Sequence, residues 1–521
     1  MTTAITTTAD TEVDGREGWR RLSPRMLLVH PVQELIRLLP VLAGLLVASL
    51  QGGGNRSYWG LIAGGLAIGL GFMRYFTTSY RITPTHVQVR RGFFRRRVLT
   101  VPRDRVRTVD VTSHLLHRVL GLARVTVGTG QTDKKNDGVK LDGLTTADAA
   151  NLNRELLHRA DPSAVPAAAG APAQPRSAAI SGADTPADES LLVKLDPAWV
   201  RYGPFTLSGL VTVGVLLAFA QRLVNEGHVN LGKIGVFRRT LDHLSSIPLP
   251  LAILEVLVVV SVFVALASTI GYVLAFWNFR LTRHPGGTLH IRRGLITTRS
   301  TTIEERRLRG VEISEPLLLR SVHGARVLAI ATGLRVGRGA ERGGSVLLPP
   351  APHDEAVRVA ALVLGDDAAF TAPLVKHGGR ARRRRYTRAF TVSVVLILAA
   401  GTLAATGQWP WWPAVGSLAL LPISALLAAD RYASLGHTIV DGSLVSRYSS
   451  VVRRRIALRS DAVIGFNIQE SYFQRRAGLA TLVATTAGGS QRYAVLDVET
   501  GEALRIAQQT VPGLIEQFLA A

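Results

Sequence analysis

Clusters of arginine are the residues of this chain with the clearest chemistry, because guanidinium groups bind phosphate and carboxylate oxygens. The first cluster flanks Gly92 and consists of Arg90, Arg91, Arg95, Arg96 and Arg97. The second cluster lies near the equivalent place late in the chain and consists of Arg453, Arg454 and Arg455. Both predict a surface for anionic lipid headgroups or acidic peptides. The alternative is general attraction to an anionic membrane, inflated by an arginine-rich genome.

The composition indicates that the anionic neighbour is a membrane. The 521 residues carry a net charge of +24, which is typical of proteins that meet a polyanion. Apolar residues make up 47% of the chain, which is high for a soluble nucleic-acid binder. No nucleic-acid motif and no regular series of stacking aromatics stands out. We therefore expect membrane lipids and no nucleic acid as partners.

The same residues give no positive sign of catalysis. The chain has no cysteine, which excludes disulfides, thiolate zinc sites and cysteine nucleophiles. His114 and His117 are three positions apart and have no third metal ligand beside them in the sequence. No Ser-His-Asp pattern and no paired carboxylates stand out. We therefore predict that the protein is not an enzyme and needs no metal or cofactor.

Six apolar stretches, joined in pairs, predict transmembrane helices, because a helix needs about 20 apolar residues to cross a bilayer. They form three expected hairpins over residues 33–74, 204–278 and 389–430, and the second has an extracytoplasmic loop at about 225–246. Glu255 lies within the fourth stretch, where an acid is costly. It is placed either in the bilayer core or, as we favour, at the outer interface near Arg222.

Flanking charge predicts the orientation of these hairpins. A third arginine cluster stands before the fifth stretch and consists of Arg382, Arg383, Arg384 and Arg385. Positive residues stay on the cytoplasmic side, so we interpret this cluster as a topology signal. The turns at the outer ends of the hairpins hold little charge. We therefore expect a multi-pass plasma-membrane protein with both termini in the cytoplasm.

A repeated unit follows each hairpin, at residues 75–160, 279–365 and 431–521. The segments "RRGFFRRRVLTVPRDRVRTVDV" and "RRGLITTRSTTIEERRLRGVEI" align without a gap, and the third copy is more divergent. Each copy shows alternating apolar residues, typical of strands, and ends on an amphipathic helix. Residues 161–190 are rich in Ala, Pro, Gly and Ser and predict a disordered linker. We also expect residues 1–25 to be disordered.

The alternation of hairpin and repeat resembles the bacterial membrane-anchored pleckstrin-homology (PH) proteins, in particular the larger kind with three domains. Thr83 to Gly92, Val101-Pro102, Val106 to Val111 and Leu115 to Gly130 carry this resemblance. The second copy departs from the pattern at His323, where the other copies have glycine. The resemblance implies a mixed membrane protein with six transmembrane helices in three hairpins. Each hairpin is then followed by a PH-like domain of two packed antiparallel sheets and a C-terminal helix.

These observations together predict a non-catalytic membrane scaffold. Its cytoplasmic PH-like domains would face anionic headgroups and protein partners, and tethering would make weak contacts multivalent. The resemblance further implies a smaller membrane PH-like partner and a role in envelope stress or antimicrobial-peptide resistance. The alternative is a component of a transport or export system, in which the six helices form a path with Glu255 on it.

Overall fold

The computed structural model describes the chain in several stretches. They are residues 19–21, 23–26, 29, 79–83, 85–91, 97–103, 106, 108–128, 139–157, 189–206, scattered positions between 209 and 221, 235–334 and 345–514. The described residues divide into two compact units. The first unit holds those up to residue 157, and the second unit holds those from residue 189 onward.

The first unit contains domain 1, built of two antiparallel sheets and a helix. Its strands are β1 (Arg20–Arg21), β2 (Ser79–Ile82), β3 (His86–Arg91), β4 (Arg97–Pro102), β5 (Thr108–Ser113), β6 (Leu122–Gly128) and β7 (Val139–Thr145). The first sheet has the order β1-β2-β3-β4, and β5, β6 and β7 pair in sequence. Val87 and Val89 from the first sheet share a core with Val125 and Leu141 from the other.

Two helices complete domain 1. They are α3 (Leu115–Val119), between β5 and β6, and α4 (Thr146–Leu157), after β7. Ala149 and Leu152 of α4 join the core of the two sheets, because an amphipathic helix must bury its apolar side. Domain 1 thus has the two sheets and the C-terminal helix that the resemblance implied.

The N-terminal segment differs from the disorder expected over residues 1–25. Arg20 and Arg21 form β1 and pair with Tyr80 and Ser79 of β2. Met26 is fully buried just beyond them. Backbone pairing and burial of one methionine therefore order part of a segment whose composition alone indicated a loose chain. Residues 1–18 and 22 lie outside the described residues.

The second unit begins with domain 2, which repeats the architecture of domain 1. Its strands are β8 (Ser190–Lys194), β9 (Arg280–His284), β10 (Thr288–Arg293), β11 (Thr298–Glu304), β12 (Leu308–Pro316), β13 (Gly324–Ala331) and β14 (Val346–Pro352). Its helices are η2 (Pro197–Phe205), η4 (Glu305–Arg307), α8 (Leu317–Ser321), α9 (His353–Leu364) and α10 (Ala368–Thr371). Ser190, the last residue of the expected linker, already lies in β8, and the linker up to residue 188 lies outside the described residues.

Domain 3 has the same plan. Its strands are β15 (Gly436–Val440), β16 (Ser443–Tyr448), β17 (Val452–Arg459), β18 (Val463–Gln469), β19 (Leu479–Thr486) and β20 (Arg492–Glu499). Its helices are η5 (Ser460–Ala462), α14 (Tyr472–Ala477) and α15 (Thr500–Thr510). Leu444 and Ile456 of one sheet, Leu482 and Val495 of the other, and Ile506 of α15 share one core.

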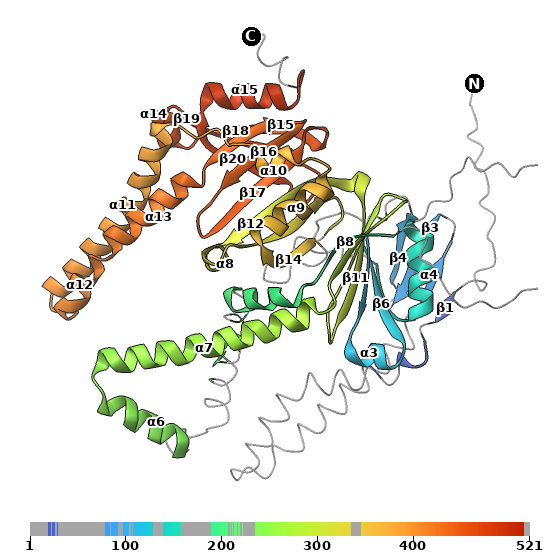
Figure 1. The fold of residues 1–521 in the computed structure, drawn as a ribbon, viewed down its shortest axis with the longest axis horizontal. Coiled ribbons are helices and arrows are strands. Elements are labelled where there is room, and N and C mark those ends of the chain that lie inside the picture. Colours follow the sequence, from blue (N-terminus) through green and yellow to red (C-terminus); the bar gives the residue numbers. More distant parts are fainter. Residues whose placement is uncertain are drawn as a thin grey trace, which may run out of the picture. The chain divides into compact units, whose positions relative to one another are not determined.

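Domains 2 and 3 are joined by a continuous sheet with the order β14-β13-β12-β17-β16-β15 (Figure 1). Strand β12 of domain 2 pairs antiparallel with β17 of domain 3 from Gly310 to Pro316. Val445 and Ala457 of domain 3 belong to the core of domain 2. The two domains therefore form one packed body, because backbone pairing and apolar burial both cross the joint.

One backbone position shows how closely the three copies match. Gly121, His323 and Gly478 follow α3, α8 and α14, and all three have left-handed φ values of 68°, 55° and 66°. Glycine adopts this conformation without steric cost, whereas a residue with a Cβ does so at a cost. His323, which departs from the sequence pattern, therefore still adopts the backbone that the pattern requires.

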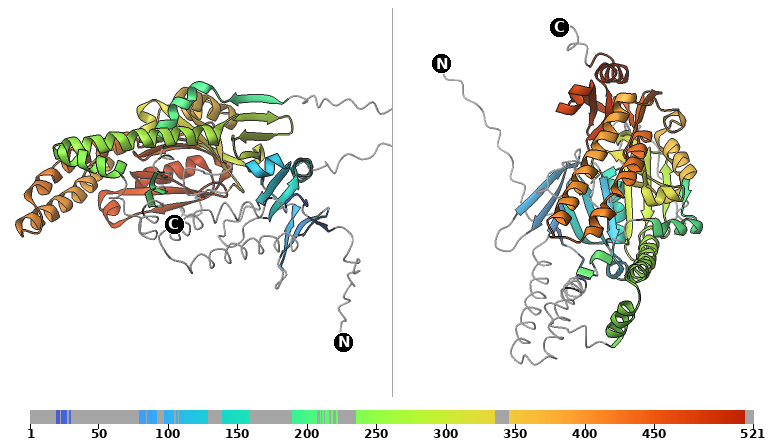
Figure 2. Two further views of the ribbon diagram at one scale, coloured as in Figure 1. Left: turned by 90° about the horizontal axis from the view of Figure 1, so that it is seen from below. Right: turned by 90° about the vertical axis from the view of Figure 1, so that its left-hand side faces the viewer.

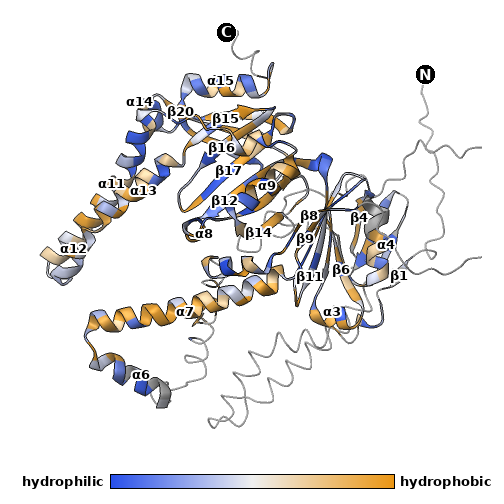
Figure 3. Cartoon of the chain, viewed as in Figure 1, coloured by the Kyte–Doolittle hydropathy of each residue, from blue (hydrophilic) through white to orange (hydrophobic). Residues whose placement is uncertain are grey.

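Three helices among the described residues are long and apolar enough to cross a membrane. They are α7 (Leu249–Phe276), α11 (Gly379–Ala405) and the span from Trp411 to Ala433, which comprises α12 (Trp411–Ser417) and α13 (Leu420–Ala433). Only 6% of the most apolar window of α7 and of α11 is buried within the protein. Figure 3 shows α7 apolar along its length and α11 polar at its start and apolar beyond. The protein is therefore a membrane protein.

Six transmembrane helices were expected, and the structure supports three candidates. The first and second expected spans, within 33–74, lie outside the described residues, and so does much of the third. The expected loop at 225–246 contains a helix, α6 (Gly235–Ser246), whose apolar and polar residues alternate with helical period. Helix α11 begins at Gly379, ten residues before the expected start of the third hairpin, because its arginines continue the helix.

The spanning helices are held firmly to the domains of the second unit. Tyr272 of α7 is buried and donates a hydrogen bond to the Pro350 carbonyl of β14 at 2.8 Å. Ser393 of α11 and Ser424 of α13 are buried against each other and join their hydroxyls in a hydrogen bond. The left-hand view in Figure 2 shows α7 (green) and the α11–α13 hairpin (orange) extending toward the same side of the second unit. This arrangement fits helices that enter one membrane.

Candidate functional site

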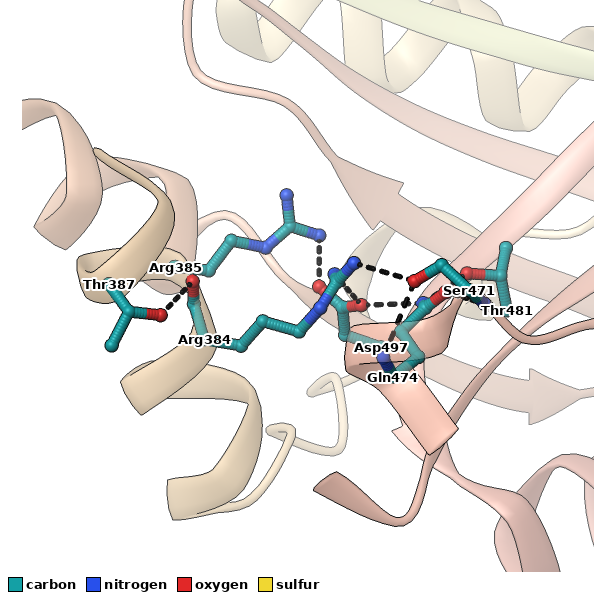
Figure 4. A network of polar contacts seen from close by, with 7 residues as sticks. All are labelled: Arg384, Arg385, Thr387, Ser471, Gln474, Thr481 and Asp497. Carbon is teal, nitrogen blue, oxygen red and sulfur yellow. Dashed lines mark hydrogen bonds and ion pairs between the residues drawn. The ribbon is translucent and has the colours of Figure 1, made fainter. Parts of the chain in front are cut away.

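The arginine cluster at the start of α11 is split between two environments. Arg384 and Arg385 point into domain 3, where both form ion pairs with Asp497 of β20 (Figure 4). The Asp497 side chain is only 1% exposed. Gln474 of α14 also donates to Asp497 at 2.8 Å, and Arg384 donates to the Ser471 hydroxyl at 3.3 Å. The base of the helix is therefore anchored to domain 3 by buried charges.

The other two arginines of this cluster face outward. Arg382 and Arg383 are exposed, and within the described part of the chain neither has an ion-pair partner. Tyr386, Phe390 and Val394 continue the same face of α11 at intervals of four residues, and together they line a shallow groove. Two cations at the polar end and an aromatic and aliphatic stripe beyond match a phospholipid, whose phosphate lies at the interface and whose chains enter the bilayer.

The second predicted cluster lies inside the joint between domains 2 and 3. Arg453 binds Asp430 of α13 at 3.1 Å, and Arg454 lies 3.5 Å from Glu312 of β12. Arg455 donates to the carbonyls of Ala369 and Ala372 at 3.1 and 2.9 Å, and burial lowers its pKa to about 10. These guanidinium groups are bound to other parts of the chain. The structure thus places all three in the joint between the domains, and the prediction that they bind headgroups stays a prediction.

Asp430 makes this joint a meeting point of three elements. It accepts from Arg320 of α8 at 3.0 Å as well as from Arg453, so it links domain 2, domain 3 and the last spanning helix. Glu315 of β12 adds a longer contact of 3.9 Å to Arg453. Charges that bind in this way rigidify the connection between the domains and the membrane.

The first predicted cluster is described only in part. Arg90 and Arg91 end β3, and Arg97 begins β4, with Arg91 opposite Arg97. Arg95 and Arg96 lie in the connecting turn, outside the described residues. The prediction that this cluster binds headgroups therefore remains a prediction.

Glu255 lies in the second turn of α7, close to the start of the helix. Its carboxylate is 45% exposed and lies 3.2 Å from the His243 imidazole of α6. The expected partner, Arg222, lies outside the described residues. Glu255 therefore lies beside α6 near the start of α7, and its placement at the outer interface rather than in the bilayer core stays a prediction.

Sequence reasoning missed a buried histidine pair just before α11. His377 and His437 are both buried, with a distance of 3.1 Å between their ring nitrogens. Burial, with His437 as the second cause, lowers the pKa of His377 to about 4. Burial also lowers the pKa of His437, while Glu502 opposes that shift from 3.7 Å. Among the described residues, no group of three or more potential ligands is arranged to hold a metal ion.

Comparisons with known proteins agree with the repeated architecture. The family described as "Bacterial PH domain" matches three regions of the chain, at residues 34–160, 229–367 and 359–509. The chain is 21% identical over 500 residues to the UPF0699 transmembrane protein YdbT of Bacillus subtilis (strain 168), with 93% of this chain and 96% of that protein covered. No solved structure matches the chain.

Proposed function

The chain belongs to the bacterial PH domain family, and we propose that it is a non-catalytic membrane scaffold that holds its PH-like domains against anionic lipid headgroups. The observation that carries this proposal is the division of the arginines at the start of α11. Arg384 and Arg385 bind Asp497 of domain 3, while Arg382 and Arg383 remain exposed on the groove face of the same helix.

The division assigns two tasks to one short segment. The buried pair keeps domain 3 at the base of the helix, because separating Asp497 from its arginines would leave buried charge uncompensated. The exposed pair lies at the level where a membrane helix meets the headgroups. Each basic residue near an anionic leaflet contributes about 1 kcal/mol. The same turn of helix would therefore bind lipid on one side and position a domain on the other.

The placement of Glu255 favours the scaffold over the transport alternative. A path through the helices would need polar groups near the middle of the spans. Glu255 instead lies in the second turn of α7 beside His243. We propose cytoplasmic domains, an inner-leaflet lipid surface and a smaller membrane PH-like partner. We attach a role in envelope stress or antimicrobial-peptide resistance to this proposal on the family resemblance alone.

Lipid retention by the purified full-length protein tests the proposal. The protein would be extracted from membranes containing phosphatidylcholine and phosphatidylglycerol, and the retained lipid would be counted by native mass spectrometry. We expect R382Q/R383Q to reduce phosphatidylglycerol retention by roughly 30-fold, because two contacts of about 1 kcal/mol are lost.

R492Q supplies the control, because Arg492 is also exposed and begins β20 away from the groove. It should retain phosphatidylglycerol as the unmodified protein does. Equal retention by R382Q/R383Q and R492Q would contradict the proposed lipid site. Loss of phosphatidylcholine together with phosphatidylglycerol would show that the arginines do not select anionic headgroups.

A further inference from the structure

The joint between domains 2 and 3 shows how one PH-like domain of this chain binds the next. Strand β12 opens the second sheet of domain 2, and it pairs with β17, the last strand of the first sheet of domain 3. Ile313 lies opposite Arg455, and Glu315 lies opposite Arg453. The joint is therefore a strand addition, in which the edge of one domain continues the sheet of the other.

Strand β18 of domain 3 is the counterpart of β12. Ile313 of β12 lies opposite Val327 of β13, and Ile468 of β18 lies opposite Leu482 of β19. Both strands have an irregular register beside a glycine, Gly310 or Gly465, and both lead into a short helix. Yet in the described part of the chain β18 ends its sheet. Ile468 is accordingly 37% exposed, whereas Ile313 is 1% exposed.

The glycine at this position makes room for a neighbouring strand. A Cβ on Gly310 would lie 2.3 Å from the Ala457 carbonyl oxygen of β17, so only glycine fits there. A Cβ on Gly465 would meet nothing nearer than the Thr485 hydroxyl at 3.6 Å. Strand β18 thus has at Gly465 the opening that β12 has at Gly310, and among the described residues only Thr485 lies within 4 Å of a Cβ placed there.

Strand β4 of domain 1 is the counterpart of β17. In the hairpin of β3 and β4, Arg91 lies opposite Arg97. In the hairpin of β16 and β17, Tyr448 lies opposite Arg454, so Arg97 corresponds to Arg454. Among the described residues β4 also ends its sheet. Val98 is 55% exposed and Leu99 is 41% exposed. Proteins rarely leave an apolar edge strand open, because it invites pairing with another chain.

We propose that β18 of one copy of this chain binds β4 of a second copy in the register of the joint between β12 and β17. Ile468 then lies opposite Val98, as Ile313 lies opposite Arg455. The contact joins two different surfaces, so it builds a row or a ring of copies. Tethering in one membrane raises the local concentration of both edges and favours the pairing.

Site-directed disulfide formation tests this proposal cleanly, because the chain has no cysteine of its own. A V98C chain with one affinity tag and an I468C chain with another would be expressed together, and the membranes would be oxidised. We expect a disulfide-linked dimer that carries both tags. Introducing G465V into the I468C chain should reduce this dimer at least tenfold, because the valine side chain fills the opening beside β18.

The joint inside the chain provides the matched control. Ser314 and Arg454 lie opposite each other, so S314C/R454C should form a disulfide within one chain under the same oxidation. This disulfide would be detected because it protects the two introduced cysteines from labelling by maleimide. It should form equally with and without G465V, which shows that the variant keeps its fold.

Four outcomes would overturn the proposal. The first is the absence of a doubly tagged dimer while the control disulfide forms. The second is a dimer of I468C chains alone, which would indicate pairing between two β18 strands. The third is a disulfide from I468C to a different protein, which would assign β18 to a companion. The fourth is a doubly tagged dimer that G465V leaves unchanged, which would reject the register.

Discussion

Arg384 at the start of a membrane-spanning helix and Asp497 on the last strand of domain 3 form an ion pair, and Asp497 is 1% exposed. Arg385 binds the second oxygen of the same carboxylate at 2.6 Å. The link ties the third hairpin to the third domain through residues more than 100 positions apart. The buried carboxylate of Asp497 is therefore one of the groups that hold domain 3 to α11.

Replacing this acid should destabilise domain 3 strongly. In D497N the shape is kept but the charge is lost, so two half-buried arginines lose their counterion, which costs about 3–5 kcal/mol. Thermal unfolding of the purified protein should show this loss of stability as a lower unfolding temperature. D461N is the matched control, because Asp461 pairs with Arg459 at the surface and is 60% exposed. Its effect should be below about 1 kcal/mol, and equal effects of the two variants would refute the anchoring role of Asp497.

The glycine in the joint between domains 2 and 3 should tolerate no side chain. G310A places a methyl group against the Ala457 carbonyl, and relieving that overlap costs about 1–3 kcal/mol. We expect faster hydrogen exchange of the β12 and β17 amides, which mass spectrometry would measure. G465A serves as the control and should leave exchange of the β12 and β17 amides unchanged, since its methyl group meets only Thr485 and not the joint between domains 2 and 3. Unchanged exchange in G310A would contradict the close approach of the strands.

Acid should weaken the region before α11 through His377. Its pKa is lowered from 6.5 to about 4 by burial and by His437, so the folded protein keeps this histidine neutral. The unfolded chain binds a proton below about pH 6.5, whereas the folded chain does so only near pH 4. The free energy of unfolding should therefore fall by about 2–3 kcal/mol as the pH drops through this window.

Thermal unfolding measured between pH 7 and pH 4 would record this slope. H377N should flatten it, because the titrating group is removed. H243N should keep it, since His243 is 57% exposed. Glu502 and Asp497 lie near the pair and favour the protonated forms, so the slope should be steeper when Glu502 is replaced by glutamine. A slope that H377N does not change would assign the acid sensitivity to other groups.

The shared acid of the joint should couple two arginines from different domains. Arg320 and Arg453 both bind Asp430, so removing one changes what the other contributes. A double-mutant cycle of R320Q and R453Q should show a coupling energy of about 0.5–3 kcal/mol in chemical unfolding. The pair R320Q and R492Q should be additive, because Arg492 lies elsewhere in domain 3. Additivity in both cycles would mean that Asp430 does not link the domains.

The repeated domains could be predicted from the sequence because their signals are local. Alternation of apolar residues, a glycine turn and a final amphipathic helix recur in each copy, and the family resemblance based on them is confirmed. The long apolar runs around Glu255 and after Arg388 likewise predicted α7 and α11, since length and hydropathy are read from neighbours in the chain.

The roles of the arginines could not be predicted in the same way. Arg382, Arg384 and Arg453 look alike in the sequence, and all were assigned to the membrane surface or to topology. Their environments depend on acids that are distant in the chain: Asp497 for Arg384, and Asp430 for Arg453. Asp497 interrupts an apolar alternation in "AVLDVE", which was the only local sign of a buried charge.

The β-rich repeats and the apolar helices between them follow from the order of amino acids alone, because periodicity, length and hydropathy act over a few neighbouring residues. Which strand edges meet, which arginines are buried and which face outward depends instead on the folded arrangement of distant segments. Those outcomes follow from strand pairing and ion pairing between residues up to more than 100 positions apart. Such pairings are selected by the packing of the whole second unit, and no local pattern encodes them.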